Sequence, residues 1–158
     1  MDFPFGSAVV SAHAHATEDE QRVLDAMRKV LPKSVEIGRY NMKGHHGNLI
    51  VSFEARVTQR KEIKELWQIV LSGLNAGDLE RLKSKVGDRV DDERNFYLRF
   101  DKQKANGGEL ALMETGDAIH LRLKILAFPA TREVAIESVG KFLEGQVKHE
   151  AEAQVPGA

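Results

Sequence analysis

The chain has 158 residues, of which 42% are hydrophobic and 30% charged, as in a globular domain. It has no cysteine, which excludes disulfides, thiolate metal sites and cysteine catalysis and is compatible with a reducing compartment. A net charge of −1 argues against a strongly basic nucleic-acid coat protein, although a local basic face is still allowed.

The first half of the chain predicts a strand, a helix and a hairpin. Alternating side chains predict a strand over residues 8–16, after a tail over residues 1–6. Thr17 with Glu20 three residues later forms a capping-box pattern, which predicts the start of a helix that Pro32 ends. Strands are expected over residues 35–42 and 49–57, joined by a Gly-His-His-Gly loop.

The second half predicts helices over residues 60–74 and 78–85, strands over 96–101 and 118–127, and a last helix over 131–147. The order is βαββα(α)ββα. Strands with one apolar face predict an α+β two-layer sandwich, with a mostly antiparallel sheet and helices on one face. We expect a single domain over residues 1–158, with an ordered core from about 8 to 147 and short tails.

If every apolar strand face meets the helices, the opposite faces form one surface. Basic side chains there can neutralise phosphates, and aromatic planes can stack on bases. Cross-strand charge pairs on a solvated sheet explain the same residues without a ligand. The residues predicted on this surface are Ser11, His13, His15, Ser52, Glu54, Arg56, Tyr97, Arg99, Asp101, His120, Arg122 and Lys124.

The loop Lys43-Gly44-His45-His46-Gly47-Asn48 combines flexible glycines with groups that contact anions, metals or nucleic acid. His13 and His15 share a strand face, as metal ligands do, but third and fourth ligands are not evident. Histidines beside a lysine also allow acid–base cleavage of RNA, although no motif sets the geometry that catalysis needs. We therefore expect no cofactor, no metal and no catalytic residue.

Four motifs in order carry a resemblance to a known family: residues 15–19 (His-Ala-Thr-Glu-Asp), 44–48 (Gly-His-His-Gly-Asn), 96–103 (Phe-Tyr-Leu-Arg-Phe-Asp-Lys-Gln) and 108–110 (Gly-Glu-Leu). Over about residues 8–145 the chain resembles an archaeal family of predicted RNA-binding proteins. That family is described as having a double-stranded-RNA-binding-domain-like fold similar to ribosomal protein L5, and as a proposed exosome subunit. Where this family has a proline after the loop, the chain has Leu49.

The resemblance implies a non-enzymatic RNA-binding protein that reads backbone and shape, as proteins that bind structured RNA do. Exosome or ribosome-related proteins are implied partners, and an edge-to-edge homodimer is compatible with the strand pattern. The rival interpretation is a protein–protein adaptor in an RNA-processing complex. No apolar run reaches the roughly 20 residues that span a bilayer, and no signal peptide is visible, so a cytoplasmic location is expected. The expected RNA contacts are Lys43, His45, His46, Asn48, Arg56, Tyr97, Arg99, Lys102, Gln103, Arg122 and Lys124.

Overall fold

Five antiparallel strands form one sheet in the order β2-β3-β1-β5-β4 in the computed structural model, which describes residues 2–44 and 47–147. The predicted α+β sandwich with an antiparallel sheet is confirmed. The strands are β1 (Phe5–Ala14), β2 (Gly38–Lys43), β3 (Leu49–Val57), β4 (Asn95–Phe100) and β5 (Ile119–Ile125).

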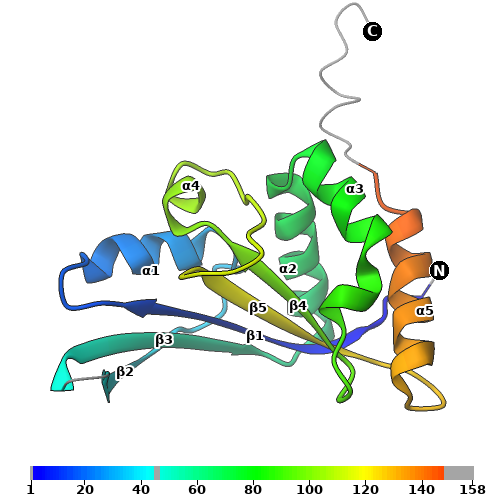
Figure 1. Ribbon diagram of the computed structural model, residues 1–158, viewed down its shortest axis with the longest axis horizontal. Helices are drawn as coiled ribbons and strands as arrows, with labels where there is room; N and C mark the ends of the chain where they lie inside the picture. The colour runs from blue at the N-terminus through cyan, green and yellow to red at the C-terminus, as the bar shows by residue number, and fades with distance from the viewer. Residues whose placement is uncertain (1, 45–46, 148–158) are drawn as a thin grey trace, which may run out of the picture.

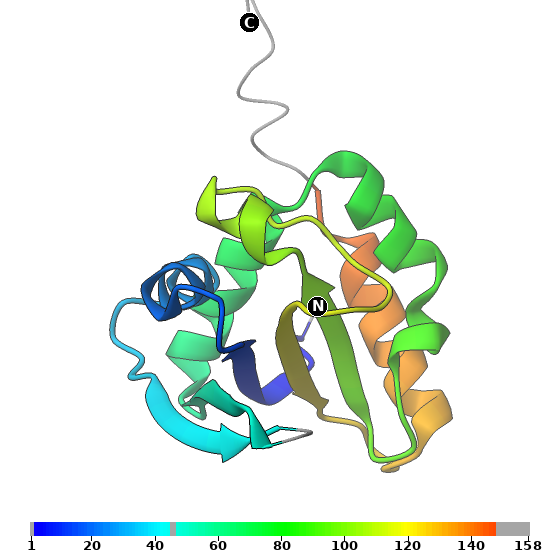
Figure 2. The ribbon, with the colours of Figure 1, turned by 60° about the vertical axis from the view of Figure 1, so that its left-hand side comes forward.

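The helices lie on one face of this sheet and leave the other uncovered (Figure 1). They are α1 (Glu20–Arg28), α2 (Arg60–Gly73), α3 (Ala76–Ser84), α4 (Lys102–Asn106) and α5 (Arg132–Glu144), with a 3-10 turn η2 (Val86–Arg89) after α3. Helix α4 packs against α1 above the sheet, although the two are far apart in sequence (Figure 2). Within the described residues, every helix is too short or too polar to cross a membrane.

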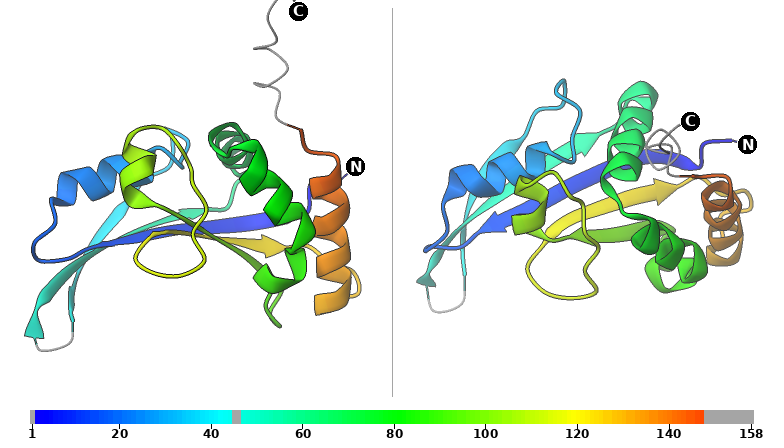
Figure 3. Two further views of the ribbon diagram at one scale, coloured as in Figure 1. Left: turned by 45° about the horizontal axis from the view of Figure 1, so that its top comes forward. Right: turned by 90° about the horizontal axis from the view of Figure 1, so that it is seen from above.

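Alternation along β1 creates the boundary between the two layers. Ala8, Val10, Ala12 and Ala14 are all buried against the helices. Both α1 and α2 contact this central strand, which its small alanines permit. The β2–β3 hairpin, in contrast, bends away from the helix layer at one end of the molecule (Figure 3). Its outer part is therefore exposed on both faces.

An aromatic cluster closes the other end of the core and corrects the expected tail over residues 1–6. Phe5 begins β1 and is fully buried. Its ring stacks on Phe96 at a centroid distance of 6.0 Å and meets Trp67 at 5.7 Å and Phe142 at 5.8 Å. Pro4 and Gly6, two residue types that are depleted in strands, flank Phe5 and obscured this strand start. Only the tertiary partners of Phe5 make it part of the core.

The start of α1 also differs from the prediction. Asp19, rather than Thr17, is the N-cap, and its side chain accepts a hydrogen bond from the Gln21 backbone N–H. Glu18 accepts from the backbone N–H of His15 instead and closes a turn after β1. Since both Thr17 and Asp19 have capping side chains, local sequence did not decide between them.

Candidate nucleic-acid interface

The strand register aligns basic side chains across the uncovered sheet face, which we call the open face. Arg122 on β5 lies opposite Val9 on β1 and opposite Tyr97 on β4. Arg56 on β3 lies opposite Val9 from the other side. Two strand spacings separate Arg56 from Arg122, about 10 Å, so the short Val9 side chain stands between two long cations.

A second row crosses the open face one step along the strands. His120 on β5 lies opposite Ser11 on β1 and Arg99 on β4. Glu54 on β3 lies opposite Ser11 from the other side. Short side chains on the central strand again separate longer ones, so the middle of the face can be approached closely by a ligand backbone.

The cations of the open face differ in how far they are already paired. Arg56 lies 3.0 Å from Glu54, yet its side chain is 68% exposed. Arg122 is exposed and has no ion pair or hydrogen bond with the described part of the chain. Arg99 donates weakly to the Gly116 carbonyl at 3.4 Å, and Lys124 donates to the Glu93 carbonyl. Arg122 is therefore the cation most available to an external phosphate.

Two tyrosines lie on the outer strands of the open face. Tyr97 on β4 is partly exposed, and burial together with its bond to Asp91 raises its pKa. Tyr40 on β2 faces the same side as Ser52, its partner on β3, and is 55% exposed. Its phenol end lies over Gly38, where any Cβ would come 2.7 Å from the hydroxyl oxygen.

Tyr40 was absent from the residues predicted on this surface. The expected strand over residues 35–42 contained it, but its facing direction depends on pairing with β3. The alternation of residues 49–57 puts Ser52 on the open face, and the hairpin register pairs Tyr40 with Ser52. These two facts together would have placed Tyr40 on the open face. Its ring is exposed, as that of Tyr97 is, and exposed aromatic rings can stack on bases.

Two histidines occupy neighbouring strands in the middle of the open face. His13 is two residues beyond Ser11, so it is a diagonal neighbour of His120. Nδ1 of His13 is buried and has no hydrogen-bond partner among the described residues. Burial lowers the pKa of His120, and the nearby Arg99 guanidinium and His13 imidazole lower it further. The neutral form of His120 is therefore favoured near neutral pH.

The hairpin loop is described only in part, since His45 and His46 lie outside the described residues. The Gly44 N–H donates to the Asn48 carbonyl at 2.7 Å, and Gly47 has a φ of 76°, a left-handed conformation that glycine adopts freely. Lys43 and Asn48 are both exposed. Lys43 pairs with Leu49, so its side chain leaves the hairpin on the helix side and not on the open face.

Lys102 and Gln103 lie in the helix layer. Nζ of Lys102 is 2.7 Å from Asp117 and 3.1 Å from Glu18, and it also donates to the His13 carbonyl. The Lys102 side chain is only 10% exposed. Gln103 is exposed on α4 beside α1, where it lines a cavity of about 290 Å³. The structure therefore separates these two residues from Arg56, Arg99, Arg122 and Lys124.

Three side chains that could serve as metal ligands surround Lys102. His15, Glu18 and Asp117 offer ligand atoms that lie within 4.8 Å of one another. His15 Nε2 is 3.2 Å from Asp117. The Lys102 ammonium already supplies positive charge to both carboxylates. In this arrangement a cationic side chain fills the place that a divalent ion would need.

Comparison with known proteins finds a family and a relative that are described as RNA-binding. A family described as RNA binding matches residues 7–125. The RNA-binding protein PAB1135 of Pyrococcus abyssi is 35% identical over 137 residues, covering 84% of this chain and 89% of that protein. An uncharacterised protein of Methanocaldococcus jannaschii is 31% identical over 141 residues, covering 84% of this chain and 93% of the relative.

Solved structures show the same fold. A protein of Archaeoglobus fulgidus from the DUF54 family is 35% identical, with a TM-score of 0.79 over 88% of this chain and 99% of that one. A DUF54 protein of Methanothermobacter thermautotrophicus is 33% identical, with a TM-score of 0.74 over 89% of this chain and 99% of that one. The likeness thus extends over the sheet and the helix layer together.

Proposed function

Because the chain belongs to this RNA-binding family, we propose that it is a non-catalytic RNA-binding protein whose open face contacts the RNA. The observation that carries the proposal is the register of the sheet. It lines up Arg56, Arg99 and Arg122 with Tyr40 and Tyr97 on a face that no helix covers. Cations neutralise phosphates, and tyrosine rings stack on bases or pack on riboses.

The contact surface consists of two parts. Arg122 and Arg56 form its centre because they are the most exposed cations of the open face. Lys124, Arg99 and Tyr97 extend it along β4 and β5. Lys43 and Asn48 add a contact at the protruding end of the hairpin, and His45 and His46, which lie outside the described residues, are proposed to join them.

Lys102 and Gln103 take a supporting role in this proposal. Lys102 joins the end of β1 to the segment before β5 through His13, Glu18 and Asp117. Its charge is therefore used inside the fold. An RNA chain on the open face would reach neither residue directly, because both lie on the helix side.

Structured RNA recognised through backbone and shape is the ligand class that we favour. The open face has several cations but few amide side chains to read base edges. We further propose that the protein works within an RNA-processing assembly such as an exosome, and that its fold is related to the double-stranded-RNA-binding domain and to ribosomal protein L5. The family resemblance of the sequence motifs supports both proposals. β2 is an outer strand of the sheet, which is where an edge-to-edge homodimer would form.

Fluorescence anisotropy with labelled hairpin and single-stranded RNA over a salt series tests the proposal. Phosphate contact predicts that log affinity falls linearly with log salt. The double variant R56A/R122A should weaken binding and lower the slope by about 1.4 to 1.8, because each lost phosphate contact removes about 0.7 to 0.9. Tighter binding of the hairpin would support recognition of structured RNA.

The matched control is R22A/K33A, which removes the same charge from exposed residues of the helix side. It should leave the slope and the affinity unchanged. Equal loss in both double variants would mean that only net charge matters. No binding of either RNA at low salt would reject direct RNA contact and favour the adaptor interpretation.

A further inference from the structure

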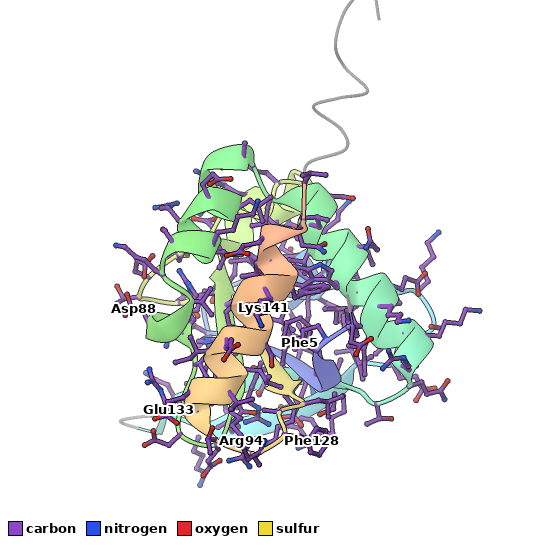
Figure 4. All side chains as sticks on the ribbon, turned by 90° about the vertical axis from the view of Figure 1, so that its right-hand side faces the viewer. Phe5, Asp88, Arg94, Phe128, Glu133 and Lys141 are labelled. Atoms are coloured by element: carbon purple, nitrogen blue, oxygen red, sulfur yellow. The ribbon has the colours of Figure 1, made fainter. Side chains whose placement is uncertain are left out.

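A groove between two helices lies at the end of the molecule where β1 begins. Helix α5 forms one wall and the start of α2 the other, and Figure 4 views this end with Lys141 on α5 and Phe128 in the connection below it. The cavity has a volume of about 510 Å³. We call it the α2–α5 groove, and its lining residues are Asp2, Phe3, Pro4, Arg60, Leu126, Phe128, Val134, Ser138 and Lys141.

The floor of the groove is apolar and unusually open to solvent. The Phe128 side chain is 87% exposed, and Leu126 is 43% exposed. The connection that carries them is held in place, because the Leu126 N–H donates to the Pro4 carbonyl at 2.7 Å and the Leu126 side chain rests against Gly6. An aromatic ring held out in water over an apolar hollow is typical of a docking site.

The rim of the groove carries two cations that contact an aromatic ring but no carboxylate of the described residues. Arg60 and Lys64, one turn apart on α2, each lie 6.0 Å from the centroid of the Phe3 ring. Neither forms an ion pair with any described residue. Lys141 on the opposite wall pairs with Glu137 at 3.0 Å. Two unpaired cations therefore border the apolar floor.

We propose that the α2–α5 groove binds an acidic peptide segment of a partner protein through an aromatic or aliphatic anchor. The anchor would cover Phe128 and Leu126, and flanking carboxylates would meet Arg60 and Lys64. A nucleic acid fits less well, because the apolar floor of Leu126 and Phe128 favours apolar side chains, whereas phosphates and riboses are polar. The groove lies apart from the open face, so this proposal does not depend on RNA binding.

The experiment pans a random linear peptide library against the full-length protein and measures the enriched peptides by fluorescence anisotropy. We expect peptides in which Asp or Glu flank Phe, Trp or Leu. F128A and R60A/K64A should each weaken binding roughly tenfold or more, as loss of an interface anchor does. K61A/K85A removes the same charge outside the groove and should bind as the wild type does, as should R56A/R122A.

The F128A variant distinguishes loss of peptide binding at the groove from unfolding of the protein. F128A should keep the wild-type melting temperature because its side chain is largely exposed, so lost binding reports the groove and not unfolding. No enrichment, enrichment of peptides without acidic residues, or binding that F128A leaves intact would overturn the proposal. A tenfold loss of affinity for labelled RNA in F128A would assign the groove to RNA instead.

Discussion

The hydroxyl of Tyr97 donates a hydrogen bond of 2.8 Å to Oδ2 of Asp91 and so fixes the ring at the outer strand of the open face. Asp91 also accepts from the backbone N–H groups of Glu93 at 2.9 Å and Asn95 at 2.8 Å. Burial raises the pKa of Asp91, but these hydrogen bonds together outweigh it and hold the pKa below its usual value. One carboxylate thus organises both the turn before β4 and a proposed RNA contact.

Asp91→Ala should destabilise the protein by about 2 to 3 kcal/mol, because it leaves several donors without their acceptor. Urea unfolding measures the change, and the exposed neighbour variant Asp92→Ala should match the wild type. A depressed carboxyl pKa stabilises the fold above the unfolded-state pKa, and that stability is lost as pH falls through the folded pKa. The difference in the free energy of unfolding between Asp91→Ala and wild type should therefore shrink in acid. An unchanged difference would exclude the carboxylate as its cause.

Lys102→Ala should convert the cluster of His15, Glu18 and Asp117 into a cation site. The variant removes the ammonium that lies 2.7 Å from Asp117 and leaves two carboxylates and an imidazole facing one another. We expect a stability loss of about 1 to 3 kcal/mol, because paired charges lose their partner. Added Zn²⁺ should raise the melting temperature of this variant but not that of the wild type.

The control for that prediction is Glu18→Gln in the Lys102→Ala background, which removes one ligand charge. It should abolish the gain from Zn²⁺. A gain of equal size in the wild type would show that the metal binds elsewhere. Unchanged stability of Lys102→Ala in the absence of metal would contradict a structural role for the lysine.

Phe5→Ala should destabilise the protein by about 3 to 5 kcal/mol, as large-to-small changes in a core do. The ring is fully buried and touches Trp67, Phe96 and Phe142. Thermal unfolding followed by Trp67 fluorescence measures the loss, and Asp2→Ala at an exposed position is the comparison. Wild-type stability of Phe5→Ala would mean that residues 1–6 are a tail after all.

Tyr40→Ala should separate stacking from phosphate contact. The ring is 55% exposed and lies over Gly38, so its removal costs the fold little. We expect about 1 to 3 kcal/mol of lost RNA-binding energy if a base stacks there. The salt slope should stay unchanged, whereas R56A/R122A lowers it. Equal affinities for Tyr40→Ala and wild type in anisotropy titrations would place the RNA away from β2.

RNA binding should become tighter as pH falls below about 6.5, the ordinary histidine pKa. Burial lowers the pKa of His120, so its charged form appears only in mild acid, where it would attract a phosphate. His120→Gln should flatten this pH dependence in anisotropy titrations. The folding stability of the RNA-free protein should change in the opposite direction to RNA affinity. A lowered histidine pKa makes the fold lose stability as pH falls below the unfolded-state pKa. An unaltered pH dependence in His120→Gln would exclude this residue.

Much of the fold followed from the sequence because hydrophobic periodicity is a local property. Alternation over Leu49–Val57 predicted β3 with the boundaries that the structure has. Alternation in β3 and in β5 predicted that Arg56 and Arg122 lie on one face of the sheet, which the register confirms. The last helix, predicted over residues 131–147, has Thr131 as its N-cap, and the Thr131 side chain accepts from the Val134 N–H at 3.2 Å. The extent of β3 and the cap of α5 depend on neighbours within a few residues, whereas the shared face of Arg56 and Arg122 also depends on how the strands pair.

The tertiary structure decided which polar residues of that sequence are free to act. Lys102 comes two residues after the end of β4, a position from which a surface contact was predicted. The end of β1 and the segment before β5 instead enclose it among His13, Glu18 and Asp117. Tyr40 gained its place on the open face only through pairing with β3. Such outcomes depend on contacts between segments up to 89 residues apart. Local patterns report periodicity, whereas burial and ion pairing are set by the packing of distant segments.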